Sequence, residues 1–270
     1  MRHPITPFAV ALISILALSS CAEMVKTFDQ MQQDDQQSRA AQLMRIADST
    51  AQGGDLNSAL ALYRRASAFA PEELPPLIAI GDTAFRLSLF DQAAKAYEQA
   101  TRIEPNSATA HSGSGKTLIA LAQPKAALFH YQATSRLAAD QYGGYNGQGV
   151  ALDLLGRHGE AQVRYRDGLK KSPDSLVLAN NLALSLAIEG DFDAALEILT
   201  PYRNNPRAGV RLRQNLALIY GLTGQKNRAA ALAALDLKEN AVLNNLKYYE
   251  KLRTLAPAER AKALLGAVTP

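Results

Sequence analysis

One run of residues in this chain has the composition of a phosphate-binding loop. Gly113, Gly115, Lys116 and Thr117 lie within the sequence Gly-Ser-Gly-Lys-Thr. In the nucleotide-binding motif, a strand leads into a glycine-rich turn, the backbone N–H groups surround the phosphates, and the lysine reaches the terminal phosphate. That motif requires a further glycine at position 110, where this chain has Ala110. Without that glycine and a preceding strand, the run predicts no nucleotide site.

The other residues able to do chemistry show no recognisable spacing. The four histidines have no pairing of the H-E-x-x-H type that would hold a metal ion: His3, His111, His130 and His158. No serine stands in a G-x-S-x-G context. We therefore expect no catalytic residues, no metal, no cofactor and no small-molecule substrate, and hence a protein that is not an enzyme.

The single cysteine, Cys21, lies in a context that predicts its use. Arg2 precedes an apolar stretch over residues 8–18, which has the length of a secretory signal and is too short for a permanent membrane span. The stretch ends in Leu-Ser-Ser-Cys, which resembles the bacterial lipobox, where the thiol is acylated and the leader is cut before the cysteine. With no second cysteine, no intrachain disulfide can form. We expect residues 1–20 to be a lipoprotein signal peptide; the alternative is an ordinary signal followed by an unpaired thiol.

The residues after Cys21 predict where the protein is anchored. Cys21 is followed by Ala22 and Glu23 rather than by an aspartate. By resemblance to lipoproteins of Gram-negative bacteria, this implies sorting to the outer membrane, facing the periplasm. Several acyl chains, such as palmitate, hold a protein stably, because each buried CH₂ contributes about 0.8 kcal/mol. Residues 21–39 are rich in Gln and Asp, too polar to build a core, and predict a flexible tether.

The charge of the chain argues against nucleic acid as a partner. The formal net charge is +4, and it becomes +3 (28 basic against 25 acidic residues) once the leader with Arg2 is removed. Basic and acidic residues alternate along the chain without forming a basic stripe.

The elements that must position these residues follow a period of 34 residues. Alanine recurs at this step in six places: Ala59, Ala93, Ala127, Ala161, Ala195 and Ala229. Four residues after each alanine, on the same helical face, stands a filler that is tyrosine in the first four repeats: Tyr63, Tyr97, Tyr131, Tyr165, Leu199 and Ala233. This period is that of the tetratricopeptide repeat, a pair of antiparallel helices.

Helix-breaking and small residues keep the same register. Pro71, Pro105 and Pro173 stand where the second helix of a pair should end. Glycines suited to a left-handed turn fall between the helices of a pair: Gly54, Gly156, Gly190 and Gly224. A third column supplies the small residue at which the second helix crosses the first: Ala47, Gly81, Gly115, Gly149, Ala183 and Ala217.

These columns predict an all-α tetratricopeptide-repeat solenoid, a right-handed superhelix of about six helix pairs over residues 40–253. The segment 254–270 is expected to form a capping helix or tail, because a stacked array must present one face to water at each end. β-Branched residues show no strand-like alternation.

The first helices of such an array line a groove that binds a protein partner. Counting from Tyr142, Leu176 and Val210 as repeat starts, amides and aliphatic residues recur in parallel stripes. The candidate groove residues are Asn146, Val150, Asn180, Asn181, Leu184, Gln214, Asn215 and Leu218. Side-chain amides both donate and accept, so they suit the backbone of a bound peptide, and leucines suit its apolar side chains. The alternative is that the amides brace neighbouring helices.

The C-terminal half resembles the TadD family, tetratricopeptide lipoproteins of the Tad (tight adherence, Flp pilus) secretion system. The resemblance rests on the lipobox and on the segments 180–184, 213–222, 236–237, 245–249 and 252–253. It implies an outer-membrane, pilotin-like role, in which the protein binds the secretin or another pilus component and assists its assembly. The alternative is a general periplasmic scaffold for envelope or outer-membrane protein biogenesis.

Overall fold

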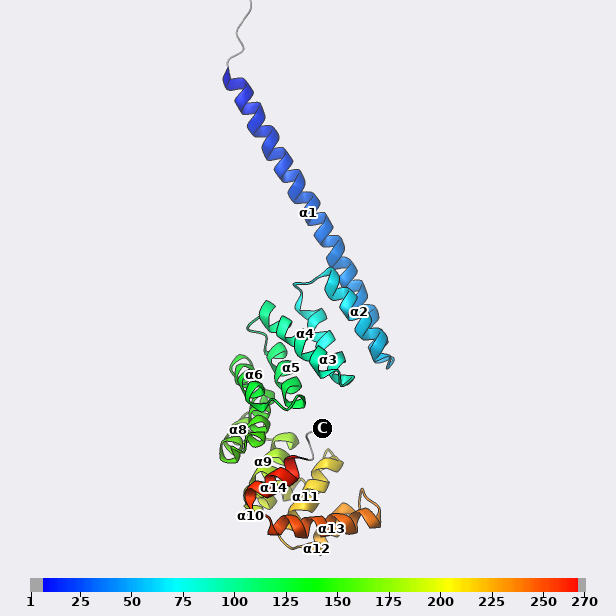
Figure 1. Ribbon diagram of the computed structural model, residues 1–270, viewed down its shortest axis with the longest axis vertical. Coiled ribbons are helices and arrows are strands. Elements are labelled where there is room, and N and C mark those ends of the chain that lie inside the picture. The colour runs from blue at the N-terminus through cyan, green and yellow to red at the C-terminus, as the bar shows by residue number, and fades with distance from the viewer. Residues whose placement is uncertain (1–6, 267–270) are drawn as a thin grey trace, which may run out of the picture. The chain divides into compact units, whose positions relative to one another are not determined.

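The computed structural model describes the backbone of residues 7–266 and the side chains of residues 30–266. Within this range the chain forms fourteen α-helices and one short 3₁₀ helix, η1, and no strand (Figure 1). The helices are α1 (Pro7–Gln52), α2 (Leu56–Phe69), α3 (Leu74–Arg86), α4 (Phe90–Ile103), α5 (Ala108–Ala120), α6 (Pro124–Leu137), α7 (Tyr142–Leu154), α8 (His158–Lys171), α9 (Leu176–Glu189), α10 (Phe192–Leu199), η1 (Thr200–Tyr202), α11 (Val210–Leu222), α12 (Lys226–Ala233), α13 (Glu239–Thr254) and α14 (Pro257–Leu265). The chain divides into two compact units, one up to Thr83 and one from Ala84.

In the first unit, the C-terminal part of α1 packs against α2. Ala40, Ala47 and Ala59 are buried, and the hydroxyl of Tyr63 donates a hydrogen bond to Asp48 Oδ1 at 2.7 Å. Asp55 begins α2 as its N-cap, accepting from the backbone N–H three residues on.

The structure differs from the flexible tether expected over residues 21–39, because these residues belong to the continuous helix α1. Every side chain from 30 to 39 is exposed, so no packing holds this part of the helix. Its polar residues support each other one turn apart instead: Gln30 donates to Asp34 at 3.2 Å, and Arg39 pairs with Asp35 at 2.9 Å. Polarity excluded a core at this point, but it did not exclude a helix.

The 34-residue register holds in three dimensions. The six alanines of the repeat column are all 0% exposed, and all six fillers that follow them are buried. The expected glycines have positive φ angles, from 73° at Gly156 to 95° at Gly190. Ser88 and Ala122 occupy the same column and adopt φ angles of 59° and 55°, although they carry side chains. The backbone of each turn is therefore set by its place in the repeat.

Tyrosines of the second helices lie over glycines of the first helices. A Cβ at Gly149 would overlap the ring of Tyr165, and a Cβ at Gly115 would come within 2.9 Å of Tyr131. This confirms the predicted role of the small residues at these crossings. In α11 a glycine outside this column has a similar contact, since a Cβ at Gly221 would overlap the ring of Tyr249 in α13.

Two second helices are shorter than the others. Helices α2, α4, α6 and α8 have 14 residues each, whereas α10 and α12 have eight. In α10 the cause is Pro201, which cannot donate to the carbonyl of Glu197 and turns the chain into η1. The shortened helices alter the outer side of the last two repeats.

The C-terminal helix α14 packs back against α9. Its Arg260 is 5% exposed and donates to the carbonyls of Ala187 and Ile188 at 3.2 and 3.0 Å, at the end of α9. The same guanidinium donates to Leu252 and Leu255, and its Cζ lies 4.9 Å from the centre of the Phe192 ring. Burial lowers the pKa of Arg260. One buried cation thus satisfies the carbonyls at two helix ends.

Candidate partner-binding face

Four asparagines form a hydrogen-bonded chain across the first helices α7, α9 and α11. Asn181 Nδ2 donates to Asn146 Oδ1 at 2.8 Å, Asn180 Nδ2 to Asn181 Oδ1 at 3.2 Å, and Asn215 Nδ2 to Asn180 Oδ1 at 2.7 Å. We call these four residues the amide ladder. Asn180 is buried, whereas the other three are partly exposed.

The ladder supports the bracing alternative for its inner members. Both the Nδ2 and the Oδ1 of buried Asn180 are hydrogen-bonded to neighbouring asparagines, so this side chain is poorly available to a partner. At the two ends, the Nδ2 group of Asn146 and the Oδ1 atom of Asn215 have no partner among the described residues, and each belongs to a partly exposed side chain. These ends retain the donor and the acceptor that a peptide group requires.

Gln214 lies outside the ladder and faces the other way. Its Nε2 donates to the carbonyl of Ala233 at 3.4 Å and to Asp236 Oδ2 at 3.1 Å. Arg213 forms an ion pair with the same carboxylate and also binds the carbonyl of Ala208. The Arg213 guanidinium, followed by Gln214, lowers the pKa of Asp236. Gln214 therefore connects α11 to the segment after α12.

The three predicted aliphatic positions differ in accessibility. Val150 and Leu184 are half-buried, but Leu218 is only 7% exposed and belongs to the main core of the second unit. The expectation that Leu218 seats a partner's side chain does not fit this burial. Leu218 lies in α11, against which the additional helix α13 packs.

The sequence analysis missed three exposed apolar residues on the same helices. Tyr142, Val177 and Val210 are 39%, 47% and 52% exposed. Tyr142 and Val177 each stand four residues before a ladder member, Asn146 and Asn181, and so lie one turn away on the same side of their helices. Val210 instead stands four residues before Gln214, which faces away from the ladder. The signal in the sequence is the spacing of these residues, since Tyr142 and Val210 are themselves repeat starts. We call Tyr142, Val177 and the amide ladder the first-helix face.

A second polar cluster is buried where α7, α8 and α9 meet. Asp153 Oδ1 accepts from Ser185 Oγ at 2.7 Å and lies 2.8 Å from His158 Nδ1, while Tyr165 donates to Oδ2 at 2.9 Å. The hydrogen bond with Asp153 raises the pKa of His158, and burial followed by Asp153 raises that of Tyr165. Ser185 is 0% exposed and donates to the carboxylate rather than to the imidazole, so the cluster is a brace and not a nucleophile with its base.

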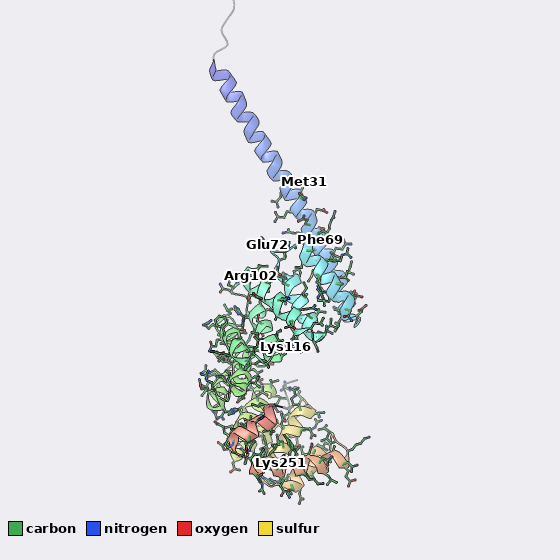
Figure 2. All side chains as sticks on the ribbon, viewed as in Figure 1. Met31, Phe69, Glu72, Arg102, Lys116 and Lys251 are labelled. Atoms are coloured by element: carbon green, nitrogen blue, oxygen red, sulfur yellow. The ribbon has the colours of Figure 1, made fainter. Side chains whose placement is uncertain are left out.

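The run that resembles a phosphate loop is the middle of helix α5. A Cβ at Gly113 would overlap the ring of Tyr97, and Thr117 Oγ1 donates to the carbonyl of Gly113 at 2.8 Å. Lys116, labelled in Figure 2, has its Nζ 4.0 Å from the centre of the Phe85 ring. Between residue 7 and this run the structure has helices and no strand, so the run does not have the fold of a phosphate-binding loop.

The remaining residues considered for chemistry are two histidines and Cys21. His111 and His130 contact each other, with 3.0 Å between their Nδ1 atoms. No group of three or more His, Cys, Asp or Glu residues with the geometry of a metal site occurs among the described residues. The side chain of Cys21 lies outside the described residues. Over the searched residues, no helix is long and apolar enough to cross a membrane.

Comparisons with known proteins support the fold. The tetratricopeptide-repeat family profile matches residues 75–107. Among curated proteins no sequence match is found. Solved structures that resemble the chain include a tetratricopeptide repeat protein from Parabacteroides merdae, with a TM-score of 0.64 and 16% identity over 78% of this chain and 84% of that one.

Two further solved structures are similar. PilF of Pseudomonas aeruginosa has a TM-score of 0.62 and 14% identity, covering 73% of this chain and 90% of its own. YrrB, described as a tetratricopeptide protein with an unusual peptide-binding site, has a TM-score of 0.54 and 20% identity, covering 70% of this chain and 94% of its own. At these identities the likeness establishes the fold alone, an all-α tetratricopeptide-repeat solenoid.

Proposed function

We propose that this tetratricopeptide-repeat protein is a non-enzymatic outer-membrane lipoprotein, anchored through Cys21, that binds a protein partner and assists assembly of the Tad/Flp pilus apparatus. The partner is the secretin or another pilus component, and the role is pilotin-like. The first-helix face carries the binding part of this proposal, because it places exposed apolar side chains one helical turn from a row of amides. A peptide needs both kinds of contact.

The segments that resemble the TadD family support the more specific part. They are separated in sequence but make direct contacts: Arg213 pairs with Asp236, Asn215 donates to Asn180, and Tyr249 packs on Gly221. Residues that resemble one family thus build one structural unit, formed by the last repeats and α13.

The partner is tested by capture from detergent-solubilised outer membranes of the native host. The binding variant is Tyr142→Asp with Val177→Asp, which places charges where the first-helix face is apolar. Both residues lie in the first turn of a helix, where the helix dipole favours an acidic side chain, so folding should be preserved. The control is Val163→Asp, the same exchange at an exposed position of α8.

We expect the wild type and the control to retain a pilus secretin, and the double variant to lose it. Retention of the secretin by the double variant would place the partner elsewhere on the molecule. Capture of envelope-assembly proteins in place of pilus components would favour the general scaffold.

The anchor is tested separately with Cys21→Ser. We expect loss of palmitate labelling and an uncleaved leader, because the lipoprotein peptidase requires an acylated cysteine. Equal labelling of the variant would refute the anchor and leave the partner experiment unaffected.

A further inference from the structure

A pocket of about 230 Å³ lies beside the shortened helices α10 and α12. Its lining residues come from the turn after η1, from α11, and from α12 and the turn that follows it: Arg203, Asn204, Tyr220, Arg228, Ala231, Leu232 and Leu235. The pocket exists because Pro201 ends α10 early and leads the chain into a turn that carries Arg203 and Asn204. Tyr220 stands five residues after Asn215, about 140° around the axis of α11, so the pocket lies on a different side of this helix from the amide ladder.

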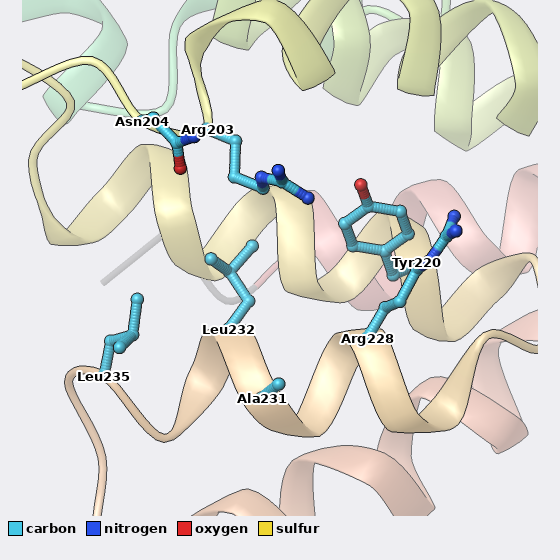
Figure 3. A pocket seen from close by; sticks show the side chains of 7 residues that line it. All are labelled: Arg203, Asn204, Tyr220, Arg228, Ala231, Leu232 and Leu235. Carbon is cyan, nitrogen blue, oxygen red and sulfur yellow. The ribbon is translucent and has the colours of Figure 1, made fainter.

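One side of the pocket is cationic. Figure 3 shows the guanidinium groups of Arg203 and Arg228 on either side of the Tyr220 ring. The Arg228 Cζ lies 5.8 Å from the centre of that ring, and its Nη1 donates to Gln225 Oε1 at 2.7 Å, which leaves its other donors for a ligand. Among the described residues, Arg203 has no ion pair and the Tyr220 hydroxyl has no hydrogen-bond partner.

No acidic residue lines the pocket. The nearest one in sequence, Asp236, is already paired with Arg213. Two guanidinium groups and a hydroxyl with no carboxylate opposite them form a site for an oxyanion, since arginine binds carboxylate and phosphate in a fork geometry.

The pocket also has an apolar part. Ala231 and Leu232 stand on α12 beside Arg228, across from Arg203 and Asn204 (Figure 3). Leu235, in the turn after α12, is 68% exposed although it is a large aliphatic side chain. A phosphate group makes no favourable contact with apolar side chains. A carboxylate attached to an apolar group can bind the arginines and also contact the leucines. Asn204 adds a side chain that can donate to and accept from a peptide group. A fatty acid has no peptide group for Asn204 to bind.

We propose that this pocket binds the C-terminal carboxylate of a peptide whose last side chain is apolar. Arg203, Arg228 and Tyr220 hold the carboxylate, Asn204 binds the last peptide group, and Leu232 with Leu235 contacts the terminal side chain. The contact is additional to the first-helix face and does not depend on it.

The test uses fluorescence anisotropy with a labelled hexapeptide that ends in alanyl-leucine, added to the protein without its leader. The comparison peptide has the same sequence with a C-terminal amide. The pocket variant is Arg203→Gln with Arg228→Gln. Its matched control is Arg166→Gln with Arg211→Gln, which removes the same charge from exposed arginines outside the pocket.

We expect the free acid to bind at least tenfold more tightly than the amide, the pocket variant to lose at least tenfold, and the control variant to stay within twofold of the wild type. Leu235→Ser should weaken the leucine-ended peptide more than a glycine-ended one. Decanoate and inorganic phosphate should displace the peptide only weakly.

Equal affinity for acid and amide, or no binding of the acid at millimolar protein, would overturn the proposal. If phosphate displaced the peptide with equal potency, the proposed contact of the terminal side chain with Leu232 and Leu235 would be wrong. If decanoate displaced it tightly, the ligand would be a fatty acid. Melting curves of each variant establish that loss of binding is not loss of folding. Because Tyr142→Asp with Val177→Asp leaves the pocket intact, its result distinguishes failure of this proposal from failure of the first.

Discussion

Ala122 adopts a backbone conformation that glycine occupies at four equivalent positions of the repeat. Its φ angle is 55°, in a turn where Gly156 has 73° and Gly224 has 80°. A left-handed conformation costs an L-residue about 1–2 kcal/mol. Glycine removes that cost but loses more entropy on folding.

We therefore expect Ala122→Gly to stabilise the protein by about 0.5–1 kcal/mol, measured by chemical denaturation. The control is Ala126→Gly, at an exposed position inside α6, which should destabilise by about 1 kcal/mol. If both variants lose stability equally, the turn at residue 122 carries no strain.

The two partly buried histidines should give opposite pH dependences. The hydrogen bond with Asp153 raises the pKa of His158 in the folded state, so the stabilisation is complete below the unfolded value of about 6.5 and is lost as pH rises through the folded pKa. Burial, with His111 nearby, lowers the pKa of His130. Stability from that residue is present above about 6.5 and is lost as pH falls through its folded pKa.

Accordingly, the stability difference between the wild type and His158→Gln should shrink between pH 6 and 8. The difference between the wild type and His130→Gln should instead shrink, or change sign, as pH falls from 7 to 5. Denaturation midpoints measured across this range check both. Parallel slopes for the two variants would mean that neither histidine titrates as its contacts indicate.

At the scale of the helices, the alanine column sets how closely the two members of a pair approach. Ala161 is 0% exposed in α8 and belongs to the core cluster of the second unit. Ala161→Leu should overpack this crossing and cost about 1–3 kcal/mol. Val163→Leu, at a 44% exposed site of the same helix, should have almost no effect on the melting temperature. Equal melting temperatures for both variants would contradict the register.

Helix α14 depends on Arg260 for its position. Arg260→Leu would leave carbonyls at the ends of α9 and α13 without their donor, and we expect a loss of about 2–3 kcal/mol. Lys262→Leu, on the exposed side of α14, provides the control. Limited proteolysis should then release the C-terminal segment from the Arg260 variant first. Equal protection in the two variants would show that apolar packing alone holds α14.

The helix pairs could be predicted from the sequence because the residues at their crossings and turns recur with a constant period. Ala161, Tyr165 and Gly156 each repeat a residue 34 positions away, so one register placed the crossings and turns together. Pro201 also indicates an early end of α10, although the 34-residue register by itself predicts a full-length helix there.

The candidate binding residues were harder to predict, because depth does not follow from position in a repeat. Val150, Leu184 and Leu218 occupy the same place in three repeats, yet Leu218 alone is buried. Helix α11, which carries Leu218, also packs against α13, a helix outside the 34-residue period whose packing no column of repeats indicates. Hydrogen bonds between amides of different helices, such as Asn215 and Asn180, are likewise visible only in three dimensions.

At the scale of the molecule, the exposed part of α1 has a consequence for an anchored protein. If the mature chain begins at Cys21, the 19 residues from 21 to 39 are helical, and at 1.5 Å per residue they measure about 28 Å. A random coil of the same length would allow the repeats to touch the lipid headgroups, whereas a helix acts as a rigid spacer of fixed length. A partner in the bilayer must then project by a comparable distance to contact the repeats. The spacer therefore selects partners by how far they extend from the membrane as well as by their surface chemistry.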